Sequence, residues 1–441
     1  MRILFLTIDA EENMRGIGSI LKSLMRAARA EGHEVGLLTG IPYKHAYEGD
    51  SELQAKIEHV HLQHYLLEGR KSFKYMIPGG YRKKNLLKKM LSLSFLDHAF
   101  MPVQPELLSG KRTLAYDMDF IVRAPFVYQF IARNKARISR KVVGRIARSY
   151  DIDLVFAVSP TVLRSKDLGR KTKLATFVHD IMPLETLETP ADNDTPARFA
   201  RQVETAVKNS DLLMANSKST ADKVMRFAPK VDIDVVYGVV SSAKTEIIDS
   251  AILQIRNLRP NHYLLFASAV EKRKNLEGLF EAYALAFDHI RMPLVIVGAP
   301  GYGFEEIVDK YESLPDHIRE NILFTGYASE DDKFTLFKHA HAFVFPSFTE
   351  GLGVQNIEAM SYGIPVLSTN VDAIPEVAGD AALLVNNPYD VHEIADALVR
   401  ICNDEALRKK LIEAGMHKYQ NFTFEKFQQR VGHSLNRLGK R

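Results

Sequence analysis

Two hydrophobic patterns alternate along this chain. Short apolar runs are typical of strands buried in a parallel sheet, and the longer segments between them carry apolar residues at helical spacing. In the first half the runs cover residues 2–8, 34–39, 153–159, 174–178 and 212–215. In the second half they cover residues 263–269, 294–297, 322–325, 342–345 and 365–368. Because the alternation occurs twice, it predicts two α/β domains, each built on a parallel sheet.

The helical segments and the gap between the two halves indicate where the domains begin and end. Helical patterns include residues 19–31 and 198–209, and Ser217 stands where it would cap the next helix. Residues 237–262 lack a strand pattern, carry mixed charge and contain one proline, as is typical of a linker. We therefore predict a first domain over residues 1–236, a linker over 237–262 and a second domain over 263–418. Residues 419–441 are expected to form a helix that packs back towards the first domain.

Composition narrows the class of protein. A chain of 441 residues with 46% hydrophobic positions fits two domain cores better than one. Cys402 is the only cysteine, which excludes an internal disulfide framework and a cysteine-based zinc site and indicates a reducing compartment, the cytoplasm. No segment approaches the length of a membrane span, and the amino-terminal apolar run meets acidic residues without a cleavage-like segment. A net charge of +4 without zinc-finger or RNP patterns gives no reason to expect a nucleic-acid partner.

One glycine-rich loop carries two carboxylates. In FVFPSFTEGLGVQNIEAMSYGIPVLS a strand stops at a proline, Glu350 lies in the loop with Gly351 and Gly353, and a helix over 354–362 contains Glu358. Both glutamates are predicted at the carboxyl ends of the strands, the edge where open α/β sheets bind ligands. A carboxylate suits the vicinal hydroxyls of a sugar, and glycines let loop amides approach it. Two glutamates alone are weak evidence, and for such a pair by itself solvated charges are the favoured interpretation.

A second loop on the same edge is cationic. The strand over 263–269 runs into Glu271, Lys272, Arg273 and Lys274, and an amphipathic helix follows. Cations at the end of a strand and the beginning of a helix form a receptor for a diphosphate. A solvated charge run is the alternative for this loop alone. Together the two loops predict a ligand with sugar hydroxyls and a diphosphate.

These motifs resemble a known family. From FASAVEKRKNLEGLFEAY through VIVGAPG, FTGYASEDD and HAFVFPSFTEGLGVQNIEAM to IPEVAGDAALLV, the second half is similar to the GT-B glycosyltransferases of family 4, particularly bacterial mannosyltransferase-like members. The first half is matched more thinly, by the GIG loop over 16–18, EGHEV, the pair His179 and Asp180, and ANSKST over 215–220. The resemblance implies two Rossmann-like domains whose parallel sheets face a central cleft.

The resemblance also implies roles for the residues. Glu350 and Glu358 would form the E-x7-E motif of the family, with Glu350 near the donor hexose and Glu358 on the ribose hydroxyls. Lys274, helped by Arg273, would hold the diphosphate, and His179 would lie beneath the donor sugar. The remaining donor-binding positions implied are Gly16 and Gly18, where the first domain closes over the phosphates, and Gly351, Leu352 and Gly353.

The chain departs from the family pattern at several positions. Ala269 stands where many relatives carry arginine, so that Arg273 is expected to supply the second cation. Gln355 and Asn356 replace residues that are usually apolar or proline, which leaves the detail of the donor pocket open. Leu21 stands where a dinucleotide fingerprint requires its third glycine, which disfavours a dehydrogenase.

The chemistry implied is retaining glycosyl transfer, in which the departing phosphate oxygen accepts the acceptor's proton. A glycosidase would use paired carboxylates without a cationic diphosphate loop, so we disfavour that class. The metal motif D-x-D of the other large glycosyltransferase fold occurs three times, over 117–119, 151–153 and 232–234, which indicates chance. We therefore expect no metal and no other cofactor.

The acceptor is the least defined partner. Residues 41–130 show no recognised motif, but the segment 81–100 is basic and amphipathic and could lie on an anionic membrane surface, the alternative being an ordinary packed helix. The basic run 133–148 is expected to be a core-packed helix. The prediction is a hexosyltransferase acting on a saccharide acceptor, either free or lipid-linked, with GDP-mannose as the favoured donor. Alternatives are a UDP-sugar-dependent transferase, a GT-B-fold phosphorylase or epimerase, and a catalytically silent subunit that binds sugar nucleotides.

Overall fold

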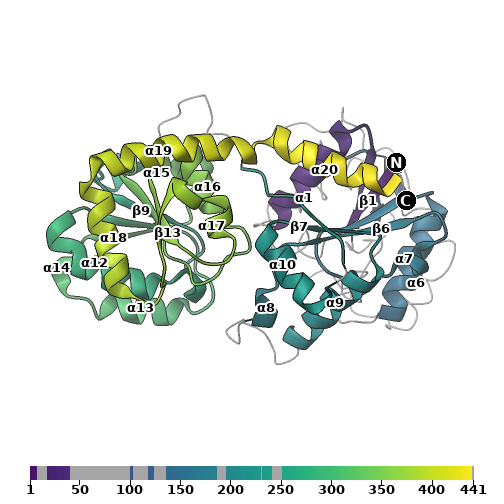
Figure 1. The fold of residues 1–441 in the computed structure, drawn as a ribbon, viewed down its shortest axis with the longest axis horizontal. Coiled ribbons are helices and arrows are strands. Elements are labelled where there is room, and N and C mark those ends of the chain that lie inside the picture. Colours follow the sequence, from purple (N-terminus) through teal and green to yellow (C-terminus); the bar gives the residue numbers. More distant parts are fainter. Residues whose placement is uncertain are drawn as a thin grey trace, which may run out of the picture.

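The fold consists of two sheets, each covered by helices (Figure 1). The computed structural model describes residues 1–6, 17–39, 100–102, 118–123, 136–185, 195–229, 231–240 and 251–439. The α/β class predicted from the alternating patterns is confirmed.

The first sheet has the strand order β3-β4-β2-β1-β5-β6-β7-β8. Every strand pair in it is parallel except β3 with β4. Its strands are β1 (Arg2–Leu6), β2 (Glu34–Thr39), β3 (Phe100–Pro102), β4 (Phe120–Arg123), β5 (Leu154–Ala157), β6 (Lys173–Val178), β7 (Leu212–Ala215) and β8 (Ile233–Val235). Its helices are α1 (Ile17–Ala30), α6 (Ala136–Ser149), α7 (Ser165–Leu168), α8 (Met182–Glu185), α9 (Thr195–Asn209) and α10 (Lys218–Phe227).

The second sheet is entirely parallel, in the order β11-β10-β9-β12-β13-β14. Its strands are β9 (Leu264–Ala267), β10 (Leu294–Val297), β11 (Ile322–Gly326), β12 (Ala342–Phe345), β13 (Val366–Thr369) and β14 (Ala382–Val385). The helical elements from this half onward are α11 (Ile252–Ile255), η4 (Lys272–Lys274), α12 (Leu276–Ile290), α13 (Phe304–Glu312), α14 (Asp316–Arg319), α15 (Glu330–Lys338), α16 (Val354–Ser361), α17 (Ile374–Val377), η5 (Gly379–Ala381), α18 (Val391–Asn403), α19 (Glu405–Tyr419), η6 (Gln420–Phe422) and α20 (Phe424–Gly439).

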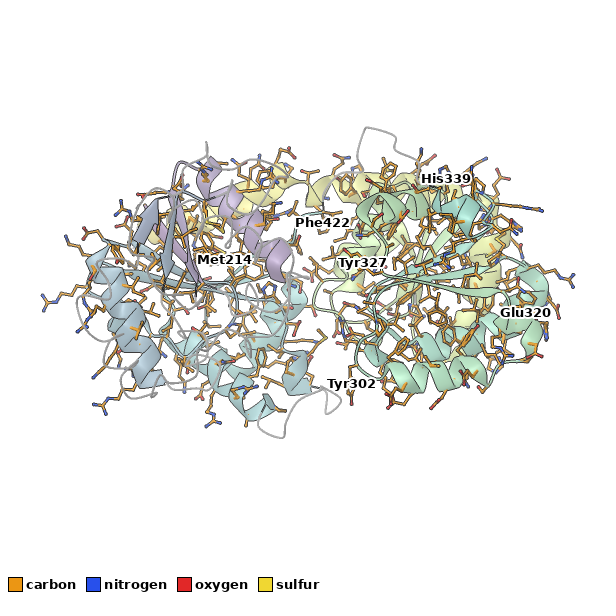
Figure 2. The ribbon with its side chains drawn as sticks, turned by 180° about the vertical axis from the view of Figure 1, so that it is seen from behind. Met214, Tyr302, Glu320, Tyr327, His339 and Phe422 are labelled. Carbon is orange, nitrogen blue, oxygen red and sulfur yellow. The ribbon has the colours of Figure 1, made fainter. Side chains whose placement is uncertain are left out.

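Parallel strands place all their carboxyl ends on one edge of a sheet. In the second sheet the loops after β9 and β12 therefore lie side by side, because these two strands are neighbours. Tyr327 follows β11 directly and lies on the side of the second domain that faces the first (Figure 2). The carboxyl edge of the second sheet thus faces the first domain.

Each predicted apolar run overlaps one observed strand, with differences at the ends. The strands β3, β4, β8 and β14 were not among the predicted runs. β3 and β4 have three and four residues and lie within 41–130, where the sequence showed no recognised motif. β8 and β14 are edge strands, and all three residues of β8 and two of the four in β14 are only half-buried. An edge strand with partial cover needs no continuous apolar run, so the pattern that identifies buried strands does not detect it.

The last helix belongs to the core of the first domain. Phe427, Val431 and Leu435 of α20 are buried in the same cluster as residues of α1 and β1. Figure 1 shows α20, in yellow, lying alongside α1, in purple. Arg437 pairs with Asp232 and Asp234 and so fixes the end of α20 to β8. This D-x-D pair is therefore occupied by a structural ion pair.

The predicted linker is only partly described. Val240 and Leu258 contribute to the core of the second domain, and α11 lies between them. The basic segment 81–100 lies outside the described residues, apart from Phe100 at the beginning of β3. α6 matches the basic run predicted as a core-packed helix, since its apolar residues Val143 and Ile146 are buried. No described helix is both long and apolar enough to cross a bilayer.

The packing of α20 predicts that shortening one of its buried side chains lowers the free energy of unfolding. Phe427 is fully buried, so Phe427→Ala should lower the free energy of unfolding of the first domain by about 3–5 kcal/mol through lost burial and the cavity left behind. Gln429→Ala, at an exposed position of the same helix, is the matched control and should change it by less than about 0.5 kcal/mol. Urea denaturation followed by circular dichroism measures both, and equal effects would show that α20 does not belong to this core.

Candidate active site

A buried ion pair lies at the carboxyl edge of the second sheet. Lys274 ends η4, just after β9, and its Nζ lies 2.5 Å from Oε1 of Glu350, in the loop between β12 and α16. The exposed fractions of the two side chains are only 1% and 7%. The Lys274 ammonium also lies 4.8 Å from the centre of the Phe345 ring. Two charges removed from water carry a large desolvation cost, so their retention at this edge indicates a functional site.

Arg273 completes the cluster from the adjacent position. Its Nη1 lies 3.3 Å from Oε2 of Glu350, and its Nε lies 2.5 Å from Oε1 of Glu271. Burial alone would raise the pKa of Glu350, but the charges of Lys274 and Arg273 hold it below its ordinary value. Glu350 is therefore ionised at neutral pH. In the sequence Glu350 and the cations belong to two separate loops, and in the structure they form ion pairs with each other.

Two glycines determine the shape of the Glu350 loop. Gly353 has φ 73° and begins α16 in the left-handed region, where a side chain would be strained. A Cβ at Gly351 would lie 2.6 Å from the carbonyl oxygen of His179 and 3.1 Å from Cβ of Asp180. Leu352 between them is buried. Gly351 thus has no room for a side chain because the loop touches the first domain.

His179 follows β6 and faces this contact. Its Nε2 lies 2.7 Å from the carbonyl oxygen of Val158, and its ring packs on Phe177 with centroids 4.9 Å apart. Burial lowers the pKa of His179 to about 4, so the imidazole is neutral at physiological pH. A neutral imidazole that donates through Nε2 keeps Nδ1 as an acceptor. The structure therefore brings the backbone of His179 and the Glu350 loop together, and the position of His179 beneath a donor sugar stays a prediction.

Helix α10 makes further contacts across the domains. Ser217 caps the helix by accepting from the amide of Thr220, as predicted, and donates through Oγ to the carbonyl oxygen of Gly351 at 2.8 Å. The amides of Lys218 and Ser219 donate to the carboxylate of Glu376 at 2.6 and 3.0 Å. Sequence reasoning identified the cap but not these contacts, because they depend on the domain arrangement.

Glu358 lies apart from the buried ion pair. It is in α16, 19% exposed, and its Oε1 lies 2.5 Å from Nζ of Lys333 in α15. Sequence reasoning did not identify Lys333. Gly18 lies buried in the first turn of α1, and Gly16 lies outside the described residues, so the proposed closure of their loop over phosphates remains a prediction.

Several buried polar atoms around the loop lack a hydrogen-bond partner. They are Oδ1 of Asn216, both polar atoms of the Asn356 side chain, and Nη1 of Arg273, whose ion pair with Glu350 lacks hydrogen-bond geometry. A Cβ at Gly351 would lie 3.3 Å from Nδ2 of Asn216, and a Cβ at Gly353 would lie 3.1 Å from Nδ2 of Asn356. Since buried polar atoms are normally paired, unpaired ones gathered at one loop fit a ligand rich in hydroxyl and phosphate oxygens.

The D-x-D segments have structural partners. Oδ2 of Asp119 accepts from the amide of Val35, and Oδ2 of Asp153 accepts from the amide of Arg2. In the part of the chain that the structure describes, no three His, Cys, Asp or Glu side chains gather to hold a metal ion. The expectation that no metal is needed remains a prediction.

Comparisons with known proteins relate the second half of the chain to a family. Residues 252–418 match the family described as Glycosyl transferases group 1. The chain is 35% identical over 177 residues to O-antigen chain mannosyltransferase B of Escherichia coli, covering 40% of this chain and 45% of that protein. It is 30% identical over 251 residues to the serotype-specific mannosyltransferase WbdA of Escherichia coli, covering 54% of this chain and 30% of that protein. The chain thus spans less than half the length of these curated relatives.

Solved structures confirm the predicted GT-B fold. Sucrose-phosphate synthase from Thermosynechococcus elongatus aligns with a TM-score of 0.69 and 16% identity, covering 100% of this chain and 99% of that one. Anabaena Alr3699/HepE in complex with UDP and glucose aligns with a TM-score of 0.62 and 19% identity, covering 99% and 100%. At these identities the likeness establishes the fold alone.

The buried histidine predicts a pH-dependent stability. The pKa of His179 is about 4 in the fold against 6.5 for an unperturbed histidine, so the unfolded chain binds more protons between these values. The free energy of unfolding should therefore rise with pH through this window, and up to about 3 kcal/mol should be lost as pH falls from 6.5 to 4. His179→Gln keeps a donor for Val158 but does not titrate, so it should lose less. Urea denaturation at a series of pH values measures this, and parallel curves for the two proteins would contradict it.

Proposed function

Residues 252–418 form a domain of the glycosyl transferases group 1 family, and from this premise we propose that the chain is a retaining, metal-independent glycosyltransferase. It moves a hexose from a nucleoside diphosphate sugar to a saccharide acceptor. The observation that carries the proposal is the buried Lys274–Glu350 pair, which is joined by Arg273 and belongs to a loop whose Gly351 lies against the backbone of His179 in the other domain.

The cations are proposed to act on the leaving group. As the glycosidic bond breaks, negative charge grows on the diphosphate, and fixed positive charges in a water-poor site stabilise it more than water would. Nη1 of Arg273 is buried, and its 3.3 Å contact with Glu350 is an ion pair without hydrogen-bond geometry, so a phosphate oxygen can accept from its N–H. Lys274 is held by Glu350 and adds its charge without needing to reorient. This preorganisation supports transfer without a metal.

The carboxylates and the histidine are proposed to hold the sugar and the ribose. Glu350 is ionised and lies near the anomeric centre, where positive charge develops as the leaving group departs. Glu358 accepts from the ribose hydroxyls with the oxygen that Lys333 leaves available. Neutral His179 accepts from a hexose hydroxyl through Nδ1, since its Nε2 is already bonded to Val158.

The donor favoured is GDP-mannose, because the relatives with the highest identity reported above are mannosyltransferases. The acceptor proposed is a saccharide, including one linked to a lipid that the basic segment 81–100 would help to reach. A single cysteine favours a cytoplasmic setting, with the enzyme peripheral at the inner face of the membrane. A UDP-sugar donor is the alternative that the next experiment distinguishes.

Nucleotide binding tests the donor site. GDP, UDP, ADP and NAD are compared by thermal stabilisation, each with and without EDTA. We expect one nucleoside diphosphate to stabilise the protein equally with EDTA, and Glu358→Ala to raise its Kd about 10- to 100-fold through loss of hydrogen bonds to a charged group. Glu405→Ala, which breaks an exposed Glu–Lys pair in α19, is the matched control and should bind like the wild type. No stabilisation by any nucleoside diphosphate, or stabilisation abolished by EDTA, would refute the proposed donor site.

Variants of the Lys274–Glu350 ion pair distinguish an effect on turnover from an effect on stability. Lys274→Met leaves the buried Glu350 carboxylate with less compensation, so it should destabilise the protein by about 3–5 kcal/mol. It should also lower turnover by about 10²-fold or more and weaken binding of GDP more than of GMP. Adding Glu350→Gln should restore much of the stability without restoring turnover. Calorimetry and product release in the two variants measure this, and a double variant with recovered turnover would exclude a role in the reaction.

A further inference from the structure

One carboxylate joins the Glu350 loop to the first domain. Asp372 follows β13, and its Oδ2 accepts from the amide of Glu350 at 3.0 Å and from Oγ1 of Thr349 at 2.5 Å. Its Oδ1 lies 2.7 Å from Nζ of Lys223, which belongs to α10 of the first domain. The two oxygens therefore hold two different partners, the loop of the ion pair on one side and the docked helix on the other.

The backbone at Asp372 indicates that this side chain is required there. Its φ is 49°, in the left-handed region, which residues other than glycine rarely adopt. Aspartate tolerates this region better than most residues because its short polar side chain can bond locally. Strain of this kind persists only where the surroundings hold it in place. The contacts of Asp372 to Thr349, Glu350 and Lys223 supply that constraint.

Lys223 pairs with one carboxylate from each domain. Its Nζ also lies 2.7 Å from Oε2 of Glu185 in α8, and the side chain is only 16% exposed. Burial would lower the pKa of Lys223, but its hydrogen bonds to Asp372 and Glu185 raise it above the ordinary value. The lysine is therefore a cation at neutral pH, paired with one carboxylate of its own domain and with Asp372 of the other.

We propose that Asp372 is a positioning residue that couples the docking of α10 to the placement of Glu350. One oxygen of Asp372 pairs with Lys223 of the first domain, and this contact fixes the carboxylate. The other oxygen holds the Thr349 hydroxyl and the Glu350 amide, so that Glu350 is placed against Lys274. When α10 moves away, Asp372 loses its cation and the loop gains freedom. The proposal rests on the proposed function of Glu350, and it makes the site fully assembled only when the domains are together.

Four variants test this coupling. Asp372→Gly accommodates the left-handed backbone and removes the carboxylate, whereas Asp372→Asn keeps an acceptor for the Glu350 amide. Lys223→Met removes only the cation from the first domain. Glu185→Gln removes the other partner of the same lysine and leaves the contact with Asp372, so it is the matched control.

The first measurement is amide hydrogen exchange over residues 349–351 without a donor, which needs no turnover. We expect exchange to accelerate about 10-fold or more in Asp372→Gly, less in Lys223→Met, and to stay within about 2-fold of the wild type in Glu185→Gln. Unchanged exchange in Asp372→Gly would overturn the proposal. Exchange accelerated in Asp372→Gly but not in Lys223→Met would overturn the coupling to the first domain.

The second measurement is the kinetics of sugar transfer. Misplacing Glu350 should lower kcat about 10- to 100-fold in Asp372→Gly and leave the donor KM within about 3-fold, with most of kcat recovered in Asp372→Asn. A fall in thermal stability with unchanged kcat would mean a structural role only and would overturn the proposal. If instead Glu350→Gln retains full turnover, the proposed function fails, and the exchange measurement still decides whether Asp372 positions the loop.

Discussion

The arrangement of the site depends on the buried pair of Lys274 and Glu350. Placing both charges away from water is unfavourable unless each is closely paired, and the 2.5 Å contact meets that requirement only if η4 and the Glu350 loop lie against each other. The sheet order brings this about, because β9 and β12 are neighbours although the two residues are 76 positions apart. The topology of the second sheet is thus the condition for the charge arrangement.

The same pair explains how the site can hold positive charge before a donor arrives. Lys274 and Arg273 share Glu350, and Arg273 also pairs with Glu271, so the cluster is close to neutral without a ligand. In the proposed function, an entering diphosphate would meet cations already fixed in place, and little solvent reorganisation would be needed as charge develops. The first domain covers one side of the Glu350 loop, because Gly351 lies against the backbone of His179.

The sequence predicted those parts of the molecule that depend on local chemistry. Continuous apolar runs identified the buried strands except the four-residue β4, and loop composition singled out Glu350 and Lys274. Their mutual pairing could not be predicted, since it follows from the neighbourhood of β9 and β12. The contact between Asp372 and Lys223 could not be predicted either, because it joins residues of two domains and neither position carries a motif.

The course of the chain between the domains constrains how the site can open. The chain crosses from the first domain to the second near Tyr237 and returns near Phe422, which lies between the two domains in Figure 2. The rings of Tyr237 and Phe422 pack edge to face with centroids 5.6 Å apart. The amide of Val240 donates to the carbonyl oxygen of Phe422 at 3.1 Å, so the two crossings form one joint. Because α20 is anchored in the first core by Phe427, this joint cannot slide without exposing apolar surface. Separation of α10 from the Glu350 loop therefore requires rotation about the joint, with the chain connections left intact.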